Sequence, residues 1–183
     1  MNSDPRTDPI ARKLAEAVSG AKEEADAGAG AHLLRTDFRA AARNAAPVQF
    51  DTLAALLRTR AEAINAQRPP EMPQFSFIPT NTRLEAGKFA IELQPLAGLD
   101  EYTVNVHVGL HPNAAQFLSL IPAVSTVSRN FRAIVDEIGF HWVDTNSGLQ
   151  HSSEDIVGEA LSALSDLLIA DHAGKLDYGE LDV

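Results

Sequence analysis

The chain has 183 residues, of which 45% are hydrophobic and 22% are charged, and its formal net charge is −10. This length and composition favour one globular domain with its own hydrophobic core. The absence of cysteine excludes disulfides and thiolate metal sites.

Charge is distributed unevenly along the chain. Residues 31–68 carry six arginines and three acids, whereas residues 133–183 carry eleven acids and one lysine. The acidic second half argues against nucleic acid as a partner, because phosphate contacts need clustered cations. The acidity either maintains solubility or holds a basic protein partner. No apolar run approaches the roughly 18 residues of a membrane span, so we expect a cytoplasmic protein without membrane contact.

The N-terminal segment predicts a weakly packed helical arm over residues 1–30. Asp8 and Pro9 are typical of a helix start, and the apolar stripe that follows consists mostly of small residues. An Ala/Gly run at residues 25–30 is expected to end this helix. Because small side chains bury little area, the arm needs a partner surface, and a second copy of the chain is a candidate. Residues 31–183 are expected to form a single α+β domain.

Two further helices are predicted over residues 31–45 and 48–67, with a break at Pro47. In the first, Arg35, Arg39 and Arg43 recur every four residues and therefore form one cationic strip. The strip is either a solvated face or a docking surface for acidic groups, in this chain or in a partner.

The stretch at residues 74–110 predicts a three-stranded antiparallel meander. Apolar and polar residues alternate over residues 88–94 and 102–110, and Phe75 and Phe77 indicate an earlier strand. Turn residues at 81–83 and 86–87 precede the second of these strands. The apolar residues of these strands can all lie on one side of the sheet. The opposite side is then polar and must meet water, the N-terminal helices or a partner.

The last third of the chain predicts helix, strand and helix again. Pro122 to Ile138 fits a helix with one apolar face, residues 140–143 and 149–151 fit short strands, and a capped helix begins at Ser152 or Ser153. The predicted fold is therefore α+β, with an antiparallel sheet of three to five strands packed by amphipathic helices. Whether residues 113–121 are helix or strand is left open.

Chemistry-bearing motifs are absent: the sequence has no phosphate loop, dinucleotide fingerprint, metalloprotease helix pair or nucleophile elbow. The polar sheet face therefore supplies the ligand-pocket candidates, which are Arg83, Glu92, Asn105 and His107. Histidines 107 and 111 lie roughly 13 Å apart along one predicted strand, too far to share a metal unless the chain turns, whereas those at 141 and 151 could approach across the predicted final hairpin. We interpret all four as solvated or capping histidines, and we expect no metal site and no cofactor. Trp142 is more typical of a core, but if exposed it would be an interface anchor beside the arginine strip.

Two functional hypotheses follow. In the first, the chain is a non-catalytic protein–protein interaction or regulatory module that forms a homo-oligomer, and its acidity favours a basic protein partner. Its predicted order of elements resembles that of secretion chaperones and related small bacterial regulators, and its acidity resembles that of toxin-immunity proteins, in build only. In the second, it is an enzyme or small-ligand-binding protein with a pocket on the polar sheet face.

Overall fold

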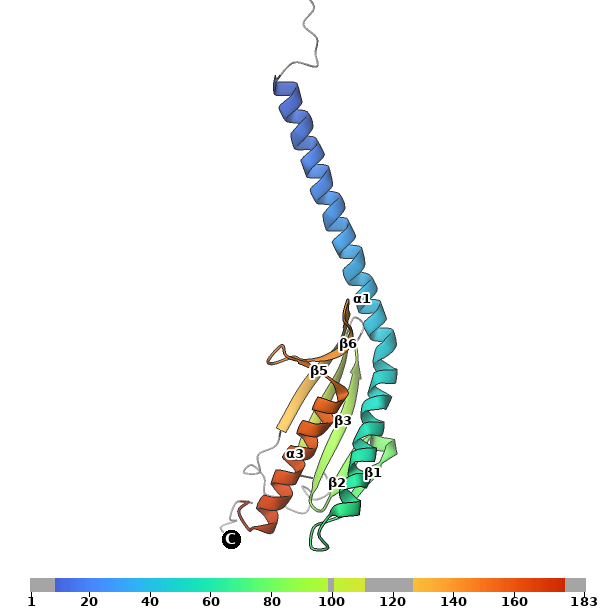
Figure 1. Cartoon of the computed structure of the whole chain (residues 1–183), viewed down its shortest axis with the longest axis vertical. Helices are drawn as coiled ribbons and strands as arrows, with labels where there is room; N and C mark the ends of the chain where they lie inside the picture. The colour runs from blue at the N-terminus through green and yellow to red at the C-terminus, as the bar shows by residue number, and fades with distance from the viewer. Residues whose placement is uncertain (1–8, 99–100, 111–126, 177–183) are drawn as a thin grey trace, which may run out of the picture. The chain divides into compact units, whose positions relative to one another are not determined.

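The computed structural model describes residues 9–98, 101–110 and 127–176 (Figure 1). The chain divides into two compact units, Met1–Ala40 and Ala41–Val183; the sequence had placed this boundary near residue 30. Within the described residues the elements are, in chain order, α1 (Pro9–Gln67), β1 (Phe75–Ile78), η2 (Pro79–Asn81), β2 (Arg83–Ala86), β3 (Phe89–Ala97), β4 (Tyr102–Leu110), β5 (Val127–Asp136), β6 (Gly139–Asp144), β7 (Gln150–His151) and α3 (Ser153–His172).

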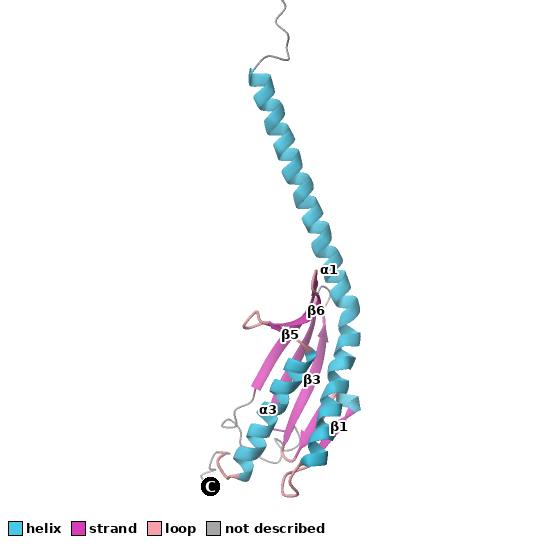
Figure 2. Cartoon of the chain, viewed as in Figure 1, coloured by secondary structure: helices cyan, strands magenta, loops and turns pink. Residues whose placement is uncertain are grey.

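The larger unit is built on one antiparallel sheet of seven described strands in the order β1 to β7. Each strand pairs with the next one along the chain, so the sheet is an uninterrupted meander. The α+β class and the antiparallel sheet are therefore confirmed, but the predicted number of three to five strands is too low. Figure 2 shows α3 and the part of α1 from residue 41 onward on the same side of this sheet.

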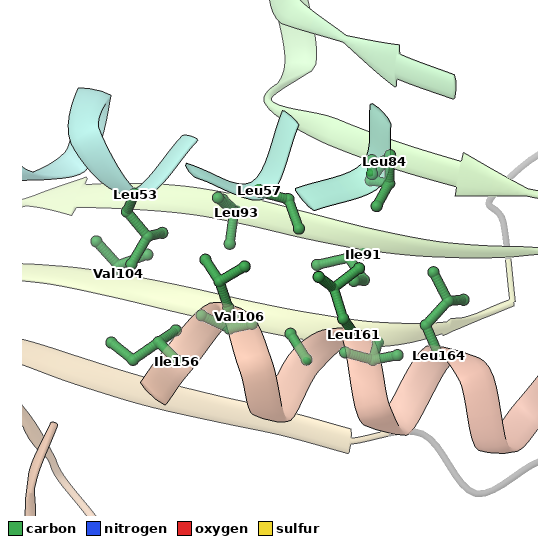
Figure 3. Packing of buried hydrophobic residues seen from close by; sticks show 14 of the residues in the cluster. Leu53, Leu57, Leu84, Ile91, Leu93, Val104, Val106, Ile156, Leu161 and Leu164 are labelled. Carbon is green, nitrogen blue, oxygen red and sulfur yellow. The ribbon is translucent and has the colours of Figure 1, made fainter. Parts of the chain in front are cut away.

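The core lies between that sheet face and the two helices. Leu53 and Leu57 of α1 and Leu164 of α3 are fully buried, and they join Ile91 and Val104 of the central strands in one cluster. Figure 3 shows these side chains meeting between the helices and strands β3 and β4. Alternation sends every second side chain into this cluster from Phe89 to Leu93 in β3 and from Val104 to Leu110 in β4. The side chains between them lie on the other sheet face, which carries Glu92, Asn105 and His107.

The final helix begins where the sequence predicts it. Ser152 accepts a hydrogen bond from the backbone N–H of Asp155, and the Asp155 carboxylate accepts one from the backbone N–H of Ser152. This capping box satisfies two of the amide groups that every helix start leaves unpaired. The hydrogen bonds from the Ser152 hydroxyl and backbone also lower the pKa of Asp155.

Several helix and strand predictions are wrong. Residues 127–136 form strand β5 where a helix from Pro122 to Ile138 was expected; residues 122–126, like 113–121, lie outside the described residues. Helix α1 runs through both the Ala/Gly run at 25–30 and Pro47, so the expected arm, break and second helix belong to one helix. Strand β2 begins at Arg83 and ends at Ala86, and both of these residues were assigned to turns. The short strands near 140–143 and 149–151 are confirmed as β6 and β7.

The outer edge of β1 is held by a side chain of α1. The amide of Asn65 accepts a hydrogen bond from the backbone N–H of Phe75 at 2.9 Å and donates one to the Phe75 carbonyl at 2.7 Å. An unpaired strand edge is a template for pairing with another chain. Asn65 takes the place of such a partner at Phe75.

We expect Asn65→Leu to lower the free energy of unfolding by about 1–2 kcal/mol, because two half-buried backbone groups lose their partner. The same change is expected to increase concentration-dependent association through the β1 edge. Urea unfolding and light scattering measure the two effects. Asn65→Asp, which keeps the acceptor for the Phe75 N–H, should retain part of the stability, and equal losses in both variants would contradict the edge assignment.

Candidate functional site

The open face of the sheet brings three of the four predicted pocket residues into one row. Arg83 of β2 lies opposite Glu92 of β3, which lies opposite His107 of β4, and Ser128 of β5 continues the row. Directly opposed residues in neighbouring antiparallel strands place their side chains about 5 Å apart. The sequence therefore placed these side chains on a common face, where they are close neighbours.

Arg83 is already bound to acids in this row. Its Nη1 donates to Glu92 Oε1 at 3.3 Å, and its Nη2 lies 2.7 Å from Glu85 Oε1. The Arg83 side chain is 14% exposed, and its Nε has no hydrogen-bond partner among the described residues. With both ends of the guanidinium paired, the row has the character of a cross-strand ion-pair ladder.

Asn105 lies in the neighbouring row of the same face. Its Nδ2 donates to Ser128 Oγ at 3.1 Å and to Asn130 Oδ1 at 2.9 Å. These bonds join β4 to β5 and use both amide hydrogens of Asn105. The four predicted pocket residues thus share one surface, where the printed contacts of Arg83, Glu92 and Asn105 link adjacent strands.

The predicted interface residues have two different placements. Trp142 is 1% exposed, donates from Nε1 to Ser153 Oγ at 3.2 Å and meets Phe140 edge to face, so it belongs to the core. Arg35 and Arg39 are exposed in the N-terminal unit, and Arg43 is exposed in the larger unit.

A cluster of charged side chains lies on the helix-covered face of the sheet, at strands β5 to β7. Arg129 of β5 donates from Nε to Asp144 Oδ2 at 2.8 Å and also pairs with Glu159 of α3. His151 of β7 approaches the same groups, with Nδ1 3.6 Å from Glu159 Oε1. The Arg129 guanidinium also lies 5.1 Å from the centre of the Phe131 ring.

Asp144 is the most deeply buried acid of this cluster, with its side chain 4% exposed. Burial by itself would raise the pKa of Asp144. The backbone N–H groups of Asn146 and Ser147 and the Arg129 guanidinium outweigh burial, so the pKa lies below its ordinary value. Burial opposes the charge of Arg129 in the same way, but Asp144 and Glu159 raise its pKa overall. Both groups are therefore ionised and joined.

This cluster is built to hold the fold together. The cavity beside Arg129 and Glu159 has a volume of about 40 Å³, whereas small-molecule sites are typically about 300–1,000 Å³. The cluster joins β5 and β6 to α3 by paired charges. We assign it a structural role, because nothing larger than a water molecule or two has room beside these groups.

A site of suitable size lies between α1 and α3. We call it the interhelix groove: a hollow of about 730 Å³ lined by side chains from residues 60–69, from Met72 and Phe75, and from residues 158–169. Its walls are mostly apolar, and Ile169 at its rim is 59% exposed. No histidine, aspartate or glutamate is among the lining residues. The groove can therefore bind an apolar group but offers no general acid or base.

Two arginines that line the interhelix groove make hydrogen bonds within the larger unit. Near the start of α3, Arg60 Nη2 donates to Glu154 Oε2 at 2.6 Å and links the two helices. Arg68 donates from Nη1 to the carbonyls of Met72 and Pro69, at 2.7 and 3.3 Å, and fixes the turn after α1. The lining residues 60–69 and 158–169 extend over about three helical turns.

Sequence reasoning did not find this groove. Leu161, Leu168 and Phe75 were recognised as apolar and are buried in the core, but whether a hollow forms beside them depends on how far α1 and α3 stand apart. One local signal was present: Gly158 stands in the middle of the predicted final helix. Glycine in a helix interior costs about 1 kcal/mol relative to alanine, so its presence there calls for a structural reason.

Comparisons of the chain with protein-family models, with curated proteins and with solved structures find no match. Among the described residues, no helix is long and apolar enough to cross a membrane. Within the same part of the chain, no group of three or more His, Asp or Glu side chains is arranged to hold a metal ion. The fold and site define an α+β protein with an apolar groove between two helices.

Proposed function

We propose that this protein is a non-catalytic interaction module that binds a segment of a protein partner in the interhelix groove. The observation that carries the proposal is the chemistry of the groove lining: it is apolar, it includes exposed Ile169, and it contains no acid or histidine. Helix-lined apolar grooves of this kind receive apolar side chains of a partner. The second hypothesis, a ligand pocket on the polar sheet face, has less support because Arg83, Glu92 and Asn105 are engaged across strands.

Gly158 supports the proposal independently. A Cβ added at Gly158 would meet no atom within 4 Å, so no crowding requires glycine there. Glycine in a helix interior costs about 1 kcal/mol relative to alanine. The helix thus carries a destabilising residue in the wall of the groove, at a position where a side chain would project into open space. Keeping that space free for a partner accounts for the glycine.

The lack of cysteine is compatible with a reducing compartment such as the cytoplasm, and self-association through the N-terminal unit stays part of the proposal. We expect deletion of residues 1–30 to weaken self-association while the larger unit stays folded, because the core residues identified all lie beyond residue 40. Analytical ultracentrifugation and thermal unfolding measure the two quantities. Loss of cooperative unfolding in the truncated protein would contradict the assignment.

We expect Ile169→Glu to reduce capture of the partner from source-cell extract by at least tenfold, since the change places a charge on the apolar rim. The measurement is quantitative mass spectrometry of proteins bound to the tagged, full-length chain. Leu149→Glu is the matched control, because Leu149 is exposed to a similar degree, 62%, and lies outside the groove lining.

Gly158→Leu is a second blocking variant, because it adds a large side chain at a groove-lining position while it removes the helix-interior glycine. It should lose the partner and keep or raise the melting temperature. A partner retained by both groove variants, or lost equally by Leu149→Glu, would overturn the proposal.

A further inference from the structure

The arginines from residue 58 onward differ in whether they form an ion pair with a described carboxylate. Of the six arginines from residue 58 to residue 176, five form an ion pair with a described carboxylate: Arg58, Arg60, Arg83, Arg129 and Arg132. Arg68 does not, since its two hydrogen bonds among the described residues go to neutral carbonyl oxygens. It is half-buried and lines the interhelix groove.

The charge of the groove is opposite to that of the chain. The net charge of the chain is −10, yet the groove lining contains Arg60 and Arg68 and no carboxylate. Arg60 is already paired with Glu154, which leaves Arg68 as the lining cation without an anionic partner in the described part of the chain. A half-buried guanidinium binds a carboxylate most strongly when apolar side chains of the partner surround that carboxylate, because both charged groups are then shielded from water.

The apolar lining and Arg68 lie together in the interhelix groove. We therefore propose that the groove binds a short protein segment in which apolar side chains are flanked by an aspartate or glutamate, and that Arg68 binds that carboxylate. This inference rests on the proposed function and deepens it by assigning the chemistry of the partner. It also revises the expectation of a basic partner: the chain is acidic as a whole, but its groove favours an acidic segment.

The geometry fits a segment of limited length. Residues 60–69 and 158–169 line the two walls, and at 1.5 Å per helical residue these walls are about 15 Å long. A helix of about ten residues spans that length. Arg68 stands at the end of the groove nearest the turn after α1, so the acidic residue of the segment belongs at that end. Its apolar side chains would then lie beside Met72, Leu161 and Ile169.

The test is selection from a displayed library of random peptides about ten residues long on the immobilised full-length protein. Sequencing should show enrichment of Leu, Ile or Phe together with Asp or Glu, and no enrichment on Ile169→Glu. On Arg68→Gln the excess of acids should vanish, and a selected acidic peptide should bind about tenfold more weakly. Arg58→Gln is the matched control, because Arg58 lies on α1, whose last residue directly precedes Arg68, is 61% exposed and is absent from the groove lining.

Three results would overturn the inference. Apolar peptides enriched without an acid excess would refute the acidic segment while the interaction module stands. An acid excess that survives Arg68→Gln would refute the role of Arg68. If no peptide is enriched and sodium dodecanoate binds instead, with Ile169→Glu abolishing that binding, the groove is a site for a small amphiphile, and the partner segment and the proposed function fail together.

Discussion

Asp144→Ala is expected to lower the free energy of unfolding by about 3–5 kcal/mol, the range measured when one member of a buried ion pair is removed. The change leaves Arg129 beside Glu159 alone and removes the acceptor of the Asn146 and Ser147 N–H groups. Urea unfolding followed by circular dichroism measures the loss. Asp144→Asn keeps an oxygen for the two N–H groups, so it should lose less, and a loss below about 1 kcal/mol in the alanine variant would contradict the structural role.

The contribution of Asp144 should also depend on pH in a defined direction. The pKa of Asp144 is lower in the folded protein than its ordinary value, which is about 3.9 for an unperturbed aspartate. The stabilisation is therefore complete above the ordinary pKa and is lost as the pH falls below it toward the folded pKa. The difference in unfolding free energy between wild type and Asp144→Asn should accordingly be constant from pH 6 to 8 and shrink below about pH 4.

Pro47→Ala is expected to raise the free energy of unfolding by about 1–3 kcal/mol. Pro47 is exposed and lies within α1, where proline lacks an N–H for the carbonyl four residues earlier and crowds that carbonyl. Alanine restores the hydrogen bond, although the more flexible unfolded chain offsets part of the gain.

Chemical unfolding of the full-length protein measures the effect of Pro47→Ala. Val48→Ala is the control on the neighbouring exposed position, 64% exposed, and should change stability by only a few tenths of a kcal/mol. If Pro47→Ala has no effect or destabilises the protein, the chain is not helical through residue 47, and the two helices predicted from the sequence are the better description.

The parts of the fold that were predictable are those with local causes. Helix α3 has its capping box, its acidic first turn and its apolar stripe within twenty residues of sequence. Strands β3 and β4 alternate cleanly because one face is buried from Phe89 to Leu93 in β3 and from Val104 to Leu110 in β4. Polar side chains could be assigned to a common surface on the other face, because successive residues of a strand point to opposite faces of the sheet.

The parts that were missed depend on partners distant in the sequence. In β5, one of the positions that face the helices is Arg129, so apolar and polar residues do not alternate there. The remaining apolar residues have a spacing that resembles a helix, and the segment was therefore predicted as one. That arginine is stable inside only because Asp144 and Glu159 approach it from β6 and α3. Helix α1 tolerates Pro47 because the turns on either side of it are held in the core by buried Ala46 and Phe50. The interhelix groove depends on the spacing of two helices 90 residues apart in the chain.

The most direct test of the central claim is the methyl NMR spectrum of isoleucine-labelled protein during titration with the captured partner. Ile64 and Ile169 line the interhelix groove, whereas Ile78 and Ile134 belong to the open sheet face that carries Arg83 and His141. Binding in the groove predicts that the Ile64 and Ile169 methyl signals shift while those of Ile78 and Ile134 stay in place. Shifts at Ile78 and Ile134, with Ile64 and Ile169 unchanged, would contradict the account and move the site to the polar face.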